Sequence, residues 1–415
     1  MKVLKKLILG ALLTGMATEL VYATNGDNMI GVSPASRAMG GLGTGICLEP
    51  TDAIFRNPGW LARQDGFNIS FGGIIFMPQV EGRSVGPAGD SGWVKSDANL
   101  FFIPEIAITN QIDENLVIGL GAYGVSGMGV DYRNEHPSLA NMHTSLQFMR
   151  FVPAIGYKIN KQLAIGGALH LAWGALDMGY TDNNGNHSGG VSNSYGIGFS
   201  IGVNFKPLDD ICLGAYYQSP ISMKYKNVLY NTNGTLPPDR FEDLKLEQPQ
   251  EVSIGVGYRP FEGLKLGFDI RWINWSDAEG YKQFKWDDQW VFAVGGEYYA
   301  TPKLALRLGY NYAKSPIKDA SNLNTAPATA NNYIPNLTAP FPDFNVAYFN
   351  LIGFPAITEH HITMGFGYHF TEHFTMNMSY VYAVENKVEA TGVGGAYAGA
   401  KNSQHSIGIS LDWNF

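Results

Sequence analysis

Hydrophobic and polar residues alternate along most of this 415-residue chain, from about residue 66 to the C-terminus. The last segment shows the pattern clearly, because Ile407, Ile409, Leu411, Trp413 and Phe415 are separated by small or polar residues. Such alternation predicts a β-strand, since successive side chains of a strand point to opposite faces. At an open edge this strand would leave backbone groups unpaired and invite aggregation. The terminal strand therefore needs a partner strand and an apolar environment.

Fourteen segments with this alternation follow one another, separated by turn residues. The connections NQIDEN, NK, PLDD, FEG, TPK and TE are short, whereas those between them run from about 10 to more than 40 residues. An even number of strands with short turns at one end and long loops at the other is typical of outer-membrane barrels. The sequence therefore predicts an all-β fold, a 14-stranded antiparallel transmembrane β-barrel. The predicted strands are roughly 66–77, 97–110, 115–127, 145–158, 162–176, 194–206, 211–224, 248–260, 263–275, 288–300, 303–314, 358–370, 373–386 and 403–415.

The two faces of the predicted strands differ in polarity as a membrane barrel requires. In the segment 303–314, Leu306 and Leu308 share one face, whereas Arg307 lies on the other. A Lys or Arg turned toward lipid at the middle of the membrane would cost about 2–4 kcal/mol. Pairing of the last strand with the first would close the barrel and remove both edges, and the apolar face of each strand would then meet lipid.

Composition and the N-terminus agree with this assignment. Glycine is frequent, with 50 residues, aromatic residues make up 13%, and charged residues only 15%. The basic MKVLKK, the apolar LILGALLTGMA and VYA, which ends at Ala23, predict a secretory signal peptide; the alternative is an uncleaved anchor helix. After the predicted signal peptide there is no run of 18 apolar residues, so the sequence predicts no transmembrane helix there. The formal net charge of −8 argues against a nucleic-acid partner.

Residues 24–62 do not alternate and are rich in glycine. A segment of this length cannot bury a core of its own, so it either hangs in the periplasm or packs inside the barrel. A fourteen-stranded barrel is wide enough to form an open pore unless something fills it. We therefore predict that 24–62 is a plug, the hatch, between a signal peptide at 1–23 and a barrel at 63–415.

The stretch SRAMGGLGTGICLEPTDAIFRNPGWLA resembles the amino-terminal hatch of the long-chain fatty acid outer-membrane transporters of the FadL/TodX type. Asp52, Asn57 and Pro58 match the hatch motif of that family, and Gly59 stands where members typically have alanine. The similarity continues through VIGLGAYGVSGMG, VPAIGYKIN and ITEHHITMGFGYHF. The terminal Phe415 is similar to the signal that bacterial barrel-assembly machinery reads.

This resemblance implies a plugged barrel in the bacterial outer membrane that takes up hydrophobic molecules, either fatty acids or aromatic hydrocarbons, by passive diffusion. It also implies that a kink in the third strand opens the wall sideways, so that ligand leaves into the membrane lipid. Four glycines would let this strand bend, namely Gly119, Gly121, Gly124 and Gly127. GLGAYG also fits the dinucleotide-binding pattern, but no helix follows it. We expect a monomer.

Several inward-facing basic residues are candidates for contacting a ligand carboxylate; the alternative is that they pair with lumen acids such as Glu297 and Asp269. His360 and His361 are adjacent on a strand and point to opposite faces, so we expect no metal site there, and nothing in the sequence implies a cofactor. The candidate ligand contacts are Arg150, His170, Arg271 and Arg307.

The long loop 315–357 contains five aromatic residues that form either an external apolar groove or a cap over the barrel mouth. They are Phe341, Phe344, Tyr348, Phe349 and Phe354. Cys47 in the hatch and Cys212 in the wall could form a disulfide in the oxidising periplasm, although two free thiols are the expectation we prefer.

Three alternative functions remain to be compared with hydrophobic uptake. A diffusion porin for polar solutes would need an open lumen. A lipase-type enzyme would need a nucleophile, a base and an orienting group, and no spacing in the sequence groups Ser, His and Asp in this way, so we do not expect an enzyme. An adhesin would depend on the long loops alone.

Overall fold

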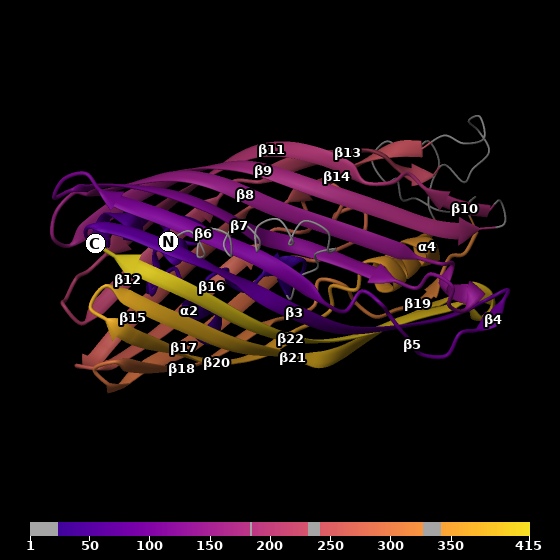
Figure 1. The fold of residues 1–415 in the computed structure, drawn as a ribbon. Helices are drawn as coiled ribbons and strands as arrows, with labels where there is room; N and C mark the ends of the chain where they lie inside the picture. The colour runs from indigo at the N-terminus through magenta and orange to yellow at the C-terminus, as the bar shows by residue number, and fades with distance from the viewer. Residues whose placement is uncertain (1–23, 183–184, 231–240, 327–341) are drawn as a thin grey trace, which may run out of the picture.

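A closed antiparallel barrel forms the wall of the protein. The computed structural model describes residues 24–182, 185–230, 241–326 and 342–415, so the predicted signal peptide lies outside the described residues. Each of fourteen strands pairs with the next, and the last pairs with the first from Tyr397 opposite Val85 to Asn414 opposite Asn68. The predicted fold is confirmed (Figure 1). The strands are β3 (Phe67–Gly86), β6 (Phe101–Gln111), β7 (Leu116–Asp131), β8 (His143–Lys158), β9 (Leu163–Asp182), β11 (Ser192–Phe205), β12 (Ile211–Gln218), β15 (Glu251–Phe261), β16 (Leu264–Ile273), β17 (Gln289–Thr301), β18 (Leu304–Ala313), β20 (His360–Thr371), β21 (Phe374–Gly392) and β22 (Tyr397–Asn414).

The sequence pattern missed one interruption of the wall. The segment 211–224 was expected to be one strand, but β12 ends at Gln218, and β13 (Ile221–Tyr230) pairs with β14 (Phe241–Gln248) in a separate two-stranded sheet. Pro220 lies at the break, where its missing N–H cannot contribute to a ladder. Alternation continues across the break, and for this reason the pattern gave no sign of it.

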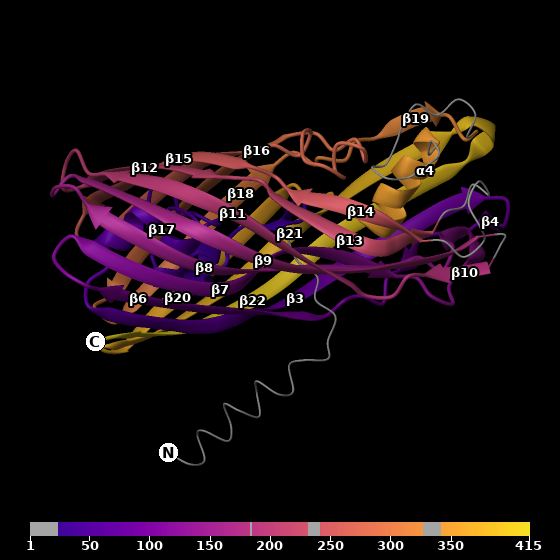
Figure 2. The ribbon, with the colours of Figure 1, turned by 90° about the horizontal axis from the view of Figure 1, so that it is seen from above.

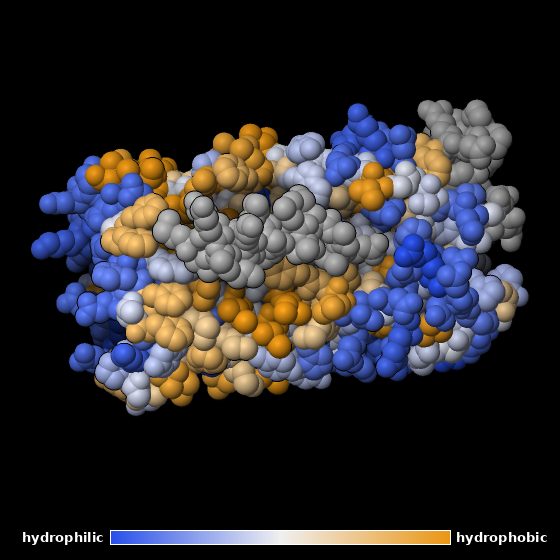
Figure 3. All heavy atoms as spheres, viewed as in Figure 1, coloured by the Kyte–Doolittle hydropathy of each residue, from blue (hydrophilic) through white to orange (hydrophobic). Residues whose placement is uncertain are grey.

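The lipid-facing surface carries the apolar half of each alternation. Leu306 and Leu308 are 47% and 63% exposed, whereas Ala305 and Arg307, which point to the opposite face, are buried. Apolar residues cover the middle of the barrel in Figure 3, and hydrophilic residues gather at the end with the long loops. That end faces the outside of the cell in outer-membrane barrels. None of the helices in the described part of the chain is long and apolar enough to cross a membrane.

The hatch is buried inside the barrel and contains short elements with clear start signals (Figures 1 and 2). Ser33 caps α2 (Pro34–Ala38) by accepting a hydrogen bond from Ser36 N at 3.0 Å. Glu49 and Asp52 form a capping box at the start of α3 (Pro50–Phe55). The other hatch elements are β1 (Thr24–Asn25), β2 (Asn28–Met29) and the 3₁₀ helix η1 (Pro58–Arg63).

The hatch enters the barrel where the wall closes on itself. Gly66 joins hatch to wall with a φ of +65°, a conformation that favours glycine. Next to it, Phe67 N donates to Phe415 O at 3.1 Å and Phe415 N to Phe67 O at 2.9 Å. The first and last residues of the barrel therefore meet at the root of the hatch.

Additional elements cover the end with the long loops, beside the β13–β14 hairpin (Figure 2). They are β4 (Gly89–Asp90), β5 (Val94–Lys95), η2 (Pro137–Leu139), β10 (Gly185–Ser188), β19 (Ala320–Leu323), α4 (Asp343–Tyr348), the π-helix η4 (Phe349–Gly353) and η5 (Val393–Gly395).

Candidate functional site

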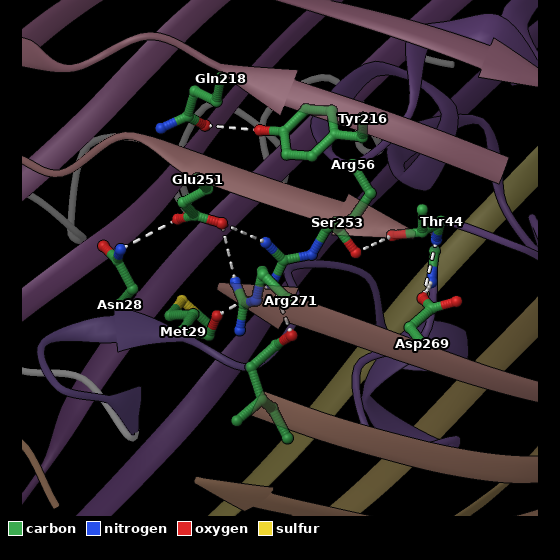
Figure 4. Close-up of polar contacts among 12 residues, drawn as sticks. Asn28, Met29, Thr44, Arg56, Tyr216, Gln218, Glu251, Ser253, Asp269 and Arg271 are labelled. Atoms are coloured by element: carbon green, nitrogen blue, oxygen red, sulfur yellow. Dashed lines mark hydrogen bonds and ion pairs between the residues drawn. The ribbon is translucent and has the colours of Figure 1, made fainter. Parts of the chain in front are cut away.

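A buried ionic network joins the hatch to the wall (Figure 4). Glu251 of β15 accepts hydrogen bonds from Arg56 of the hatch at 3.3 Å, Arg271 of β16 at 3.1 Å and Asn28 of the hatch at 3.0 Å. The Arg56 guanidinium also donates to the carbonyl of Ile30 at 2.7 Å. A single carboxylate therefore holds two guanidinium groups, and removing one member of such a network leaves a buried charge without its partner.

A second wall carboxylate binds the hatch backbone directly. Asp269 of β16 accepts hydrogen bonds from the N–H groups of Gly43, Thr44 and Gly45 at 2.9, 2.8 and 2.9 Å. The hatch approaches the wall so closely here that a Cβ on Gly45 would lie 2.3 Å from Val256 N. We expected Asp269 to pair with a lumen arginine. Instead, its carboxylate accepts hydrogen bonds from three backbone N–H groups of the hatch.

The predicted hatch motif lies where α3 ends and η1 begins. Asn57 Oδ1 accepts from Gly59 N at 3.0 Å and caps η1, which has Pro58 in its first turn. Its Nδ2 donates to Thr44 O and to Val203 O of the wall, both at 3.0 Å. Asn57 thus fixes a turn of the hatch and ties it to β11.

The other two motif positions are equally close-packed. Asp52 Oδ2 accepts from Glu49 N at 3.2 Å, and burial raises the pKa of Asp52 to about 7. A Cβ on Gly59 would lie 2.9 Å from Asn204 N. A Cβ at this position would therefore require the wall backbone or the hatch to shift.

Replacement of Asn57 by alanine should loosen the hatch. It removes the side-chain donor to Val203 O and the acceptor of Gly59 N, whereas Thr44 O keeps its hydrogen bond from Trp60 Nε1; the loss costs about 1–3 kcal/mol. We expect a lower unfolding temperature and faster proteolysis of the hatch in detergent. Asn115→Ala, in an exposed periplasmic turn, is the control, and equal behaviour of the two variants would contradict the assigned role.

The third barrel strand, β7, leaves its neighbour β6 halfway along. The β6–β7 ladder runs from Gln111 opposite Val117 to Glu105 opposite Tyr123 and stops there, although β6 continues to Phe101 along β3. At that point the register of β7 against β8 shifts between Gly124 and Ser126, which leaves Val125 as the extra residue of a β-bulge. Within the described residues, no ladder joins β6 to residues 124–131.

The predicted glycines have different surroundings in this strand. A Cβ on Gly119 or Gly121 would lie 3.0 Å from Leu61 of the hatch or 2.6 Å from the Tyr123 ring, so these two glycines make room for side chains in the lumen. Gly124 adjoins the bulge, and Gly127 follows it.

The hatch occupies the interrupted part of the wall. Asn28 pairs with Ser126 of β7, and Gly127 N donates to Asp27 O at 3.2 Å. Next to Asn28, Met29 packs against apolar side chains of β3 and β6, namely Ile74, Phe76, Phe101 and Ile103. Residues 27–29 thus bind the free edge of β7 and cover the apolar edge of the adjacent strands.

A long loop holds the same hatch residues from the extracellular side. Tyr281 donates its hydroxyl to Asp27 Oδ2. Burial raises the pKa of Asp27 to about 6, and the Tyr281 hydrogen bond acts in the opposite direction. Gly26 has a φ of +64°, and a Cβ there would lie 2.7 Å from the Trp275 ring. Asp27, Trp275 and Tyr281 were not predicted as site residues.

Of the four predicted ligand contacts, two arginines are paired with wall carboxylates, whereas His170 and Arg150 are not. Arg307 pairs with Glu297 at 2.7 Å, as expected, whereas Arg271 pairs with Glu251. His170 is buried and hydrogen-bonds to Ser200 Oγ at 2.9 Å.

Arg150 differs from the other two arginines. All three are buried, but Arg150 donates to the neutral Gln218 and lies over the Phe148 ring. It forms no ion pair with any residue that the structure describes. Of the three arginine candidates, Arg150 is the one without a carboxylate partner among the described residues.

The described aromatic residues of the loop 315–357 pack inward. Phe349 stacks on Phe284 at 5.1 Å and contacts Phe354 at 5.2 Å, and Phe344 is 8% exposed. Tyr348 donates to Ser138 O at 3.0 Å. These four residues cover the barrel mouth, and Phe341 lies outside the described residues.

Both cysteines are free thiols in the structure. Cys212 Sγ accepts a hydrogen bond from Asn204 at 2.7 Å, and Cys47 lies near the carbonyl of Glu49. They line one small pocket at the periplasmic end, between hatch and wall, together with Trp60.

Comparison with known proteins agrees with this architecture. A family model described as outer membrane protein transport protein (OMPP1/FadL/TodX) matches residues 26–334. No match is found among curated proteins.

Solved structures share the fold over nearly the whole chain. The toluene transporter TodX of Pseudomonas putida has a TM-score of 0.67 at 17% identity, covering 93% of this chain and 99% of its own. A Pseudomonas aeruginosa FadL homologue has a TM-score of 0.69 at 16% identity, with 94% and 100% covered. The Ralstonia pickettii toluene transporter TbuX has a TM-score of 0.65 at 16% identity, covering 93% of this chain and 98% of its own. Because the family match spans most of the chain, this protein belongs to the FadL/TodX family of outer-membrane transporters of hydrophobic compounds.

Proposed function

We propose that this protein carries long-chain fatty acids or aromatic hydrocarbons passively into the outer membrane and releases them sideways, through the wall between β6 and β7. The observation that supports this route is the interrupted ladder beyond Glu105 and Tyr123. Straight passage along the barrel axis would require displacing a hatch that Glu251 and Asp269 hold by buried charged hydrogen bonds.

The chemistry of the interrupted wall suits an apolar ligand. On one side lie Phe76, Phe101 and Ile103, and beyond the bulge Met128 and Val130 are buried in the main apolar cluster. A long acyl chain gains about 0.8 kcal/mol for every CH₂ group removed from water. Lateral release into lipid keeps that gain, whereas release into the aqueous periplasm would lose it.

Residues 27–29 are the movable closure in this proposal. They contact the free edge of β7 through one bridge pair and one backbone hydrogen bond, which is far fewer bonds than a full ladder would supply. Withdrawal must also break the hydrogen bonds of Asn28 to Glu251, of Tyr281 to Asp27 and of Arg56 to the Met29 carbonyl. Withdrawal of this short segment would open the apolar side of the wall while α2, α3 and η1 stay anchored.

Uptake by whole cells tests the proposal. Cells that produce the protein should accumulate radiolabelled oleate or toluene faster than cells without it, and an uncoupler that dissipates the membrane potential should leave the initial rate unchanged. Equal rates with and without the protein would contradict the function, and loss of the difference with uncoupler would contradict passive diffusion.

Replacement of Arg150 by glutamine should separate the two ligand classes. Glutamine retains a donor toward Gln218 but removes the charge, so oleate should bind to the purified protein about 10–100-fold more weakly, as expected for loss of a charge-assisted hydrogen bond. Toluene has no carboxylate and should bind unchanged. Unaltered oleate affinity would remove Arg150 from the ligand contacts.

A further inference from the structure

Four carboxyl groups meet where the hatch packs against β6 and β22, and we call them the acid cluster. Two belong to the hatch, at the start of α3, and one each to β6 and β22; they are Glu49, Asp52, Glu105 and Asp412. The first three side chains are at most 2% exposed, and Asp412 is partly buried. Carboxylates gathered in a buried place repel one another and cannot all be ionised unless cations balance them.

A serine of β22 connects the hatch to the wall within the acid cluster. Ser410 Oγ lies 3.0 Å from Glu49 Oε1 and 3.1 Å from Asp412 Oδ2. A hydroxyl group carries one proton, so it can donate fully to only one of these two carboxyl oxygens. The other contact becomes a hydrogen bond if that carboxyl group is itself protonated and donates to the serine oxygen. The geometry around Ser410 therefore favours a proton on one of the two acids.

Glu105 approaches the same serine across one glycine. It lies opposite Gly72 in the ladder of β6 with β3, and Gly72 lies opposite Ser410 in the ladder of β3 with β22. A Cβ on Gly72 would lie 2.8 Å from Glu105 Oε1 and 2.8 Å from Ser410 Cα. On its other side, Glu105 faces its cross-strand partner Tyr123 of β7.

The carboxyl group of Glu105 has no hydrogen-bond partner. Neither of its oxygens accepts a hydrogen bond from any residue that the structure describes. A buried carboxylate without hydrogen bonds is so costly that the group binds a proton instead of remaining charged. Glu105 therefore indicates a second proton in the acid cluster, independently of the contacts of Ser410.

The cation nearest to Asp412 is bound to another acid. Arg307 of β18 pairs with Glu297 at 2.7 Å, and Lys265 of β16 binds the same Glu297 at 2.6 Å. Arg307 reaches Asp412 only through Asn377, which accepts a hydrogen bond from the guanidinium at 2.6 Å and donates one to Asp412 at 2.8 Å. Much of the positive charge of this pair is therefore used by Glu297.

Arg37 of α2 is the third cation beside the acid cluster. Its guanidinium donates to Gly31 O at 3.0 Å and to Ser406 Oγ at 2.6 Å. Together with Glu297, five carboxyl groups therefore share three cations, and two protons would bring the group to neutrality. The other titratable groups that face these acids and cations are Cys47 of the hatch and His361 and His369 of β20.

We propose that the acid cluster is a proton-binding site that stabilises the docked hatch. It binds protons while α3 lies against the wall and releases them when the hatch leaves. In the part of the chain that the structure describes, no three His, Cys, Asp or Glu side chains are arranged to hold a metal ion, so we assign the missing positive charge to protons. The proposal is independent of the route by which a ligand leaves the barrel.

Docking of the hatch should weaken as the pH rises. Burial raises the pKa of Asp52 to about 7, and burial, followed by the neighbouring Asp412 and Asp52, holds the pKa of Glu49 well above its usual range. The docked hatch therefore binds more protons than the released hatch, in which such groups ionise near pH ~4. The stabilisation is complete below about pH 4 and is lost as the pH rises through about 7, by up to about tenfold in the docking equilibrium per pH unit and linked proton.

Ion conductance of the wild-type protein in planar bilayers tests the proposal. Openings should be at least about tenfold more frequent at about pH 8.5 than at about pH 5.5, because the docked hatch has lost its protons. Deuterium exchange of the α3 amides, corrected for its intrinsic pH dependence, should accelerate in parallel. Equal openings and equal corrected exchange at the two pH values would overturn the proposal. A pH dependence that disappears with a chelator of divalent cations would assign the acid cluster to a metal ion and would also overturn it.

The variant Glu105→Gln then locates the protons. Glutamine retains the size of the side chain and loses no hydrogen bond to a described residue, but it cannot ionise. At about pH 8.5 this variant should open about tenfold less often than the wild-type protein. Glu114→Gln, an exposed glutamate in the periplasmic turn after β6, is the matched control and should keep the full pH dependence. If Glu105→Gln also kept it, the linked protons would lie elsewhere and the assignment would be wrong.

Discussion

Deletion of Val125 should reduce uptake of hydrophobic compounds to the level of cells without the protein. Val125 is the extra residue that shifts the register of β7 between Gly124 and Ser126. Without it, the residues after Gly124 alternate in phase with those before, so the strand can continue its ladder with β6. The interruption that supports lateral release would then be sealed by backbone hydrogen bonds.

The measurement is uptake of radiolabelled oleate and toluene, with the amount of folded barrel in the outer membrane determined by heat-modifiable electrophoretic mobility. Val125→Ala is the matched control, because it shortens the side chain but keeps the extra residue and should retain uptake. A folded deletion variant with wild-type uptake would rule out the β6–β7 route. Transport by another route would still stand in that case.

Replacement of Glu251 by alanine should release the hatch and raise ion conductance. Arg56 and Arg271 both bind this carboxylate and are almost fully buried. Leaving buried charges without a partner costs about 3–5 kcal/mol, and part of that cost is relieved if the hatch moves away from the wall and water enters. The variant should therefore unfold at a lower temperature and conduct ions in planar bilayers.

Glu279→Ala provides the comparison for this prediction. Glu279 forms an ion pair with Lys245 at 3.0 Å in a partly exposed extracellular region, where such pairs contribute only about 0–1 kcal/mol. Its conductance should stay at the wild-type level. If both variants conduct equally little, the Glu251 network does not hold the hatch in place.

The regular wall could be predicted from the sequence because its determinant is local. Alternation such as that of Leu306, Arg307 and Leu308 fixes which side of a strand meets lipid, and the turn lengths fix the order of the strands. The hatch was predicted for a related reason, since a segment without alternation had to lie somewhere other than the wall. Composition alone could not show which wall residues would bind it.

The site depended on contacts between residues far apart in the chain. Tyr281 and Asp27 are 254 positions apart, and neither lies in a motif. We expected Asp269 to pair with an arginine, but its carboxylate accepts hydrogen bonds from three backbone N–H groups of the hatch. The glycines predicted that this strand can bend, but the place of the bulge at Val125 depends on the register against β8, which the sequence of one strand does not give. A search for buried acids opposite a glycine-rich hatch would have been the best available signal.

The meeting of Phe67 and Phe415 at the root of the hatch has a consequence for biogenesis. The backbone hydrogen bonds at this end of the closing ladder join Phe67, next to the hatch, to Phe415. During membrane insertion, closure of the seam therefore also fixes the point from which the hatch enters the barrel, because Gly66 adjoins the last of these pairs. Sealing of the cylinder and docking of its plug would then form one cooperative step.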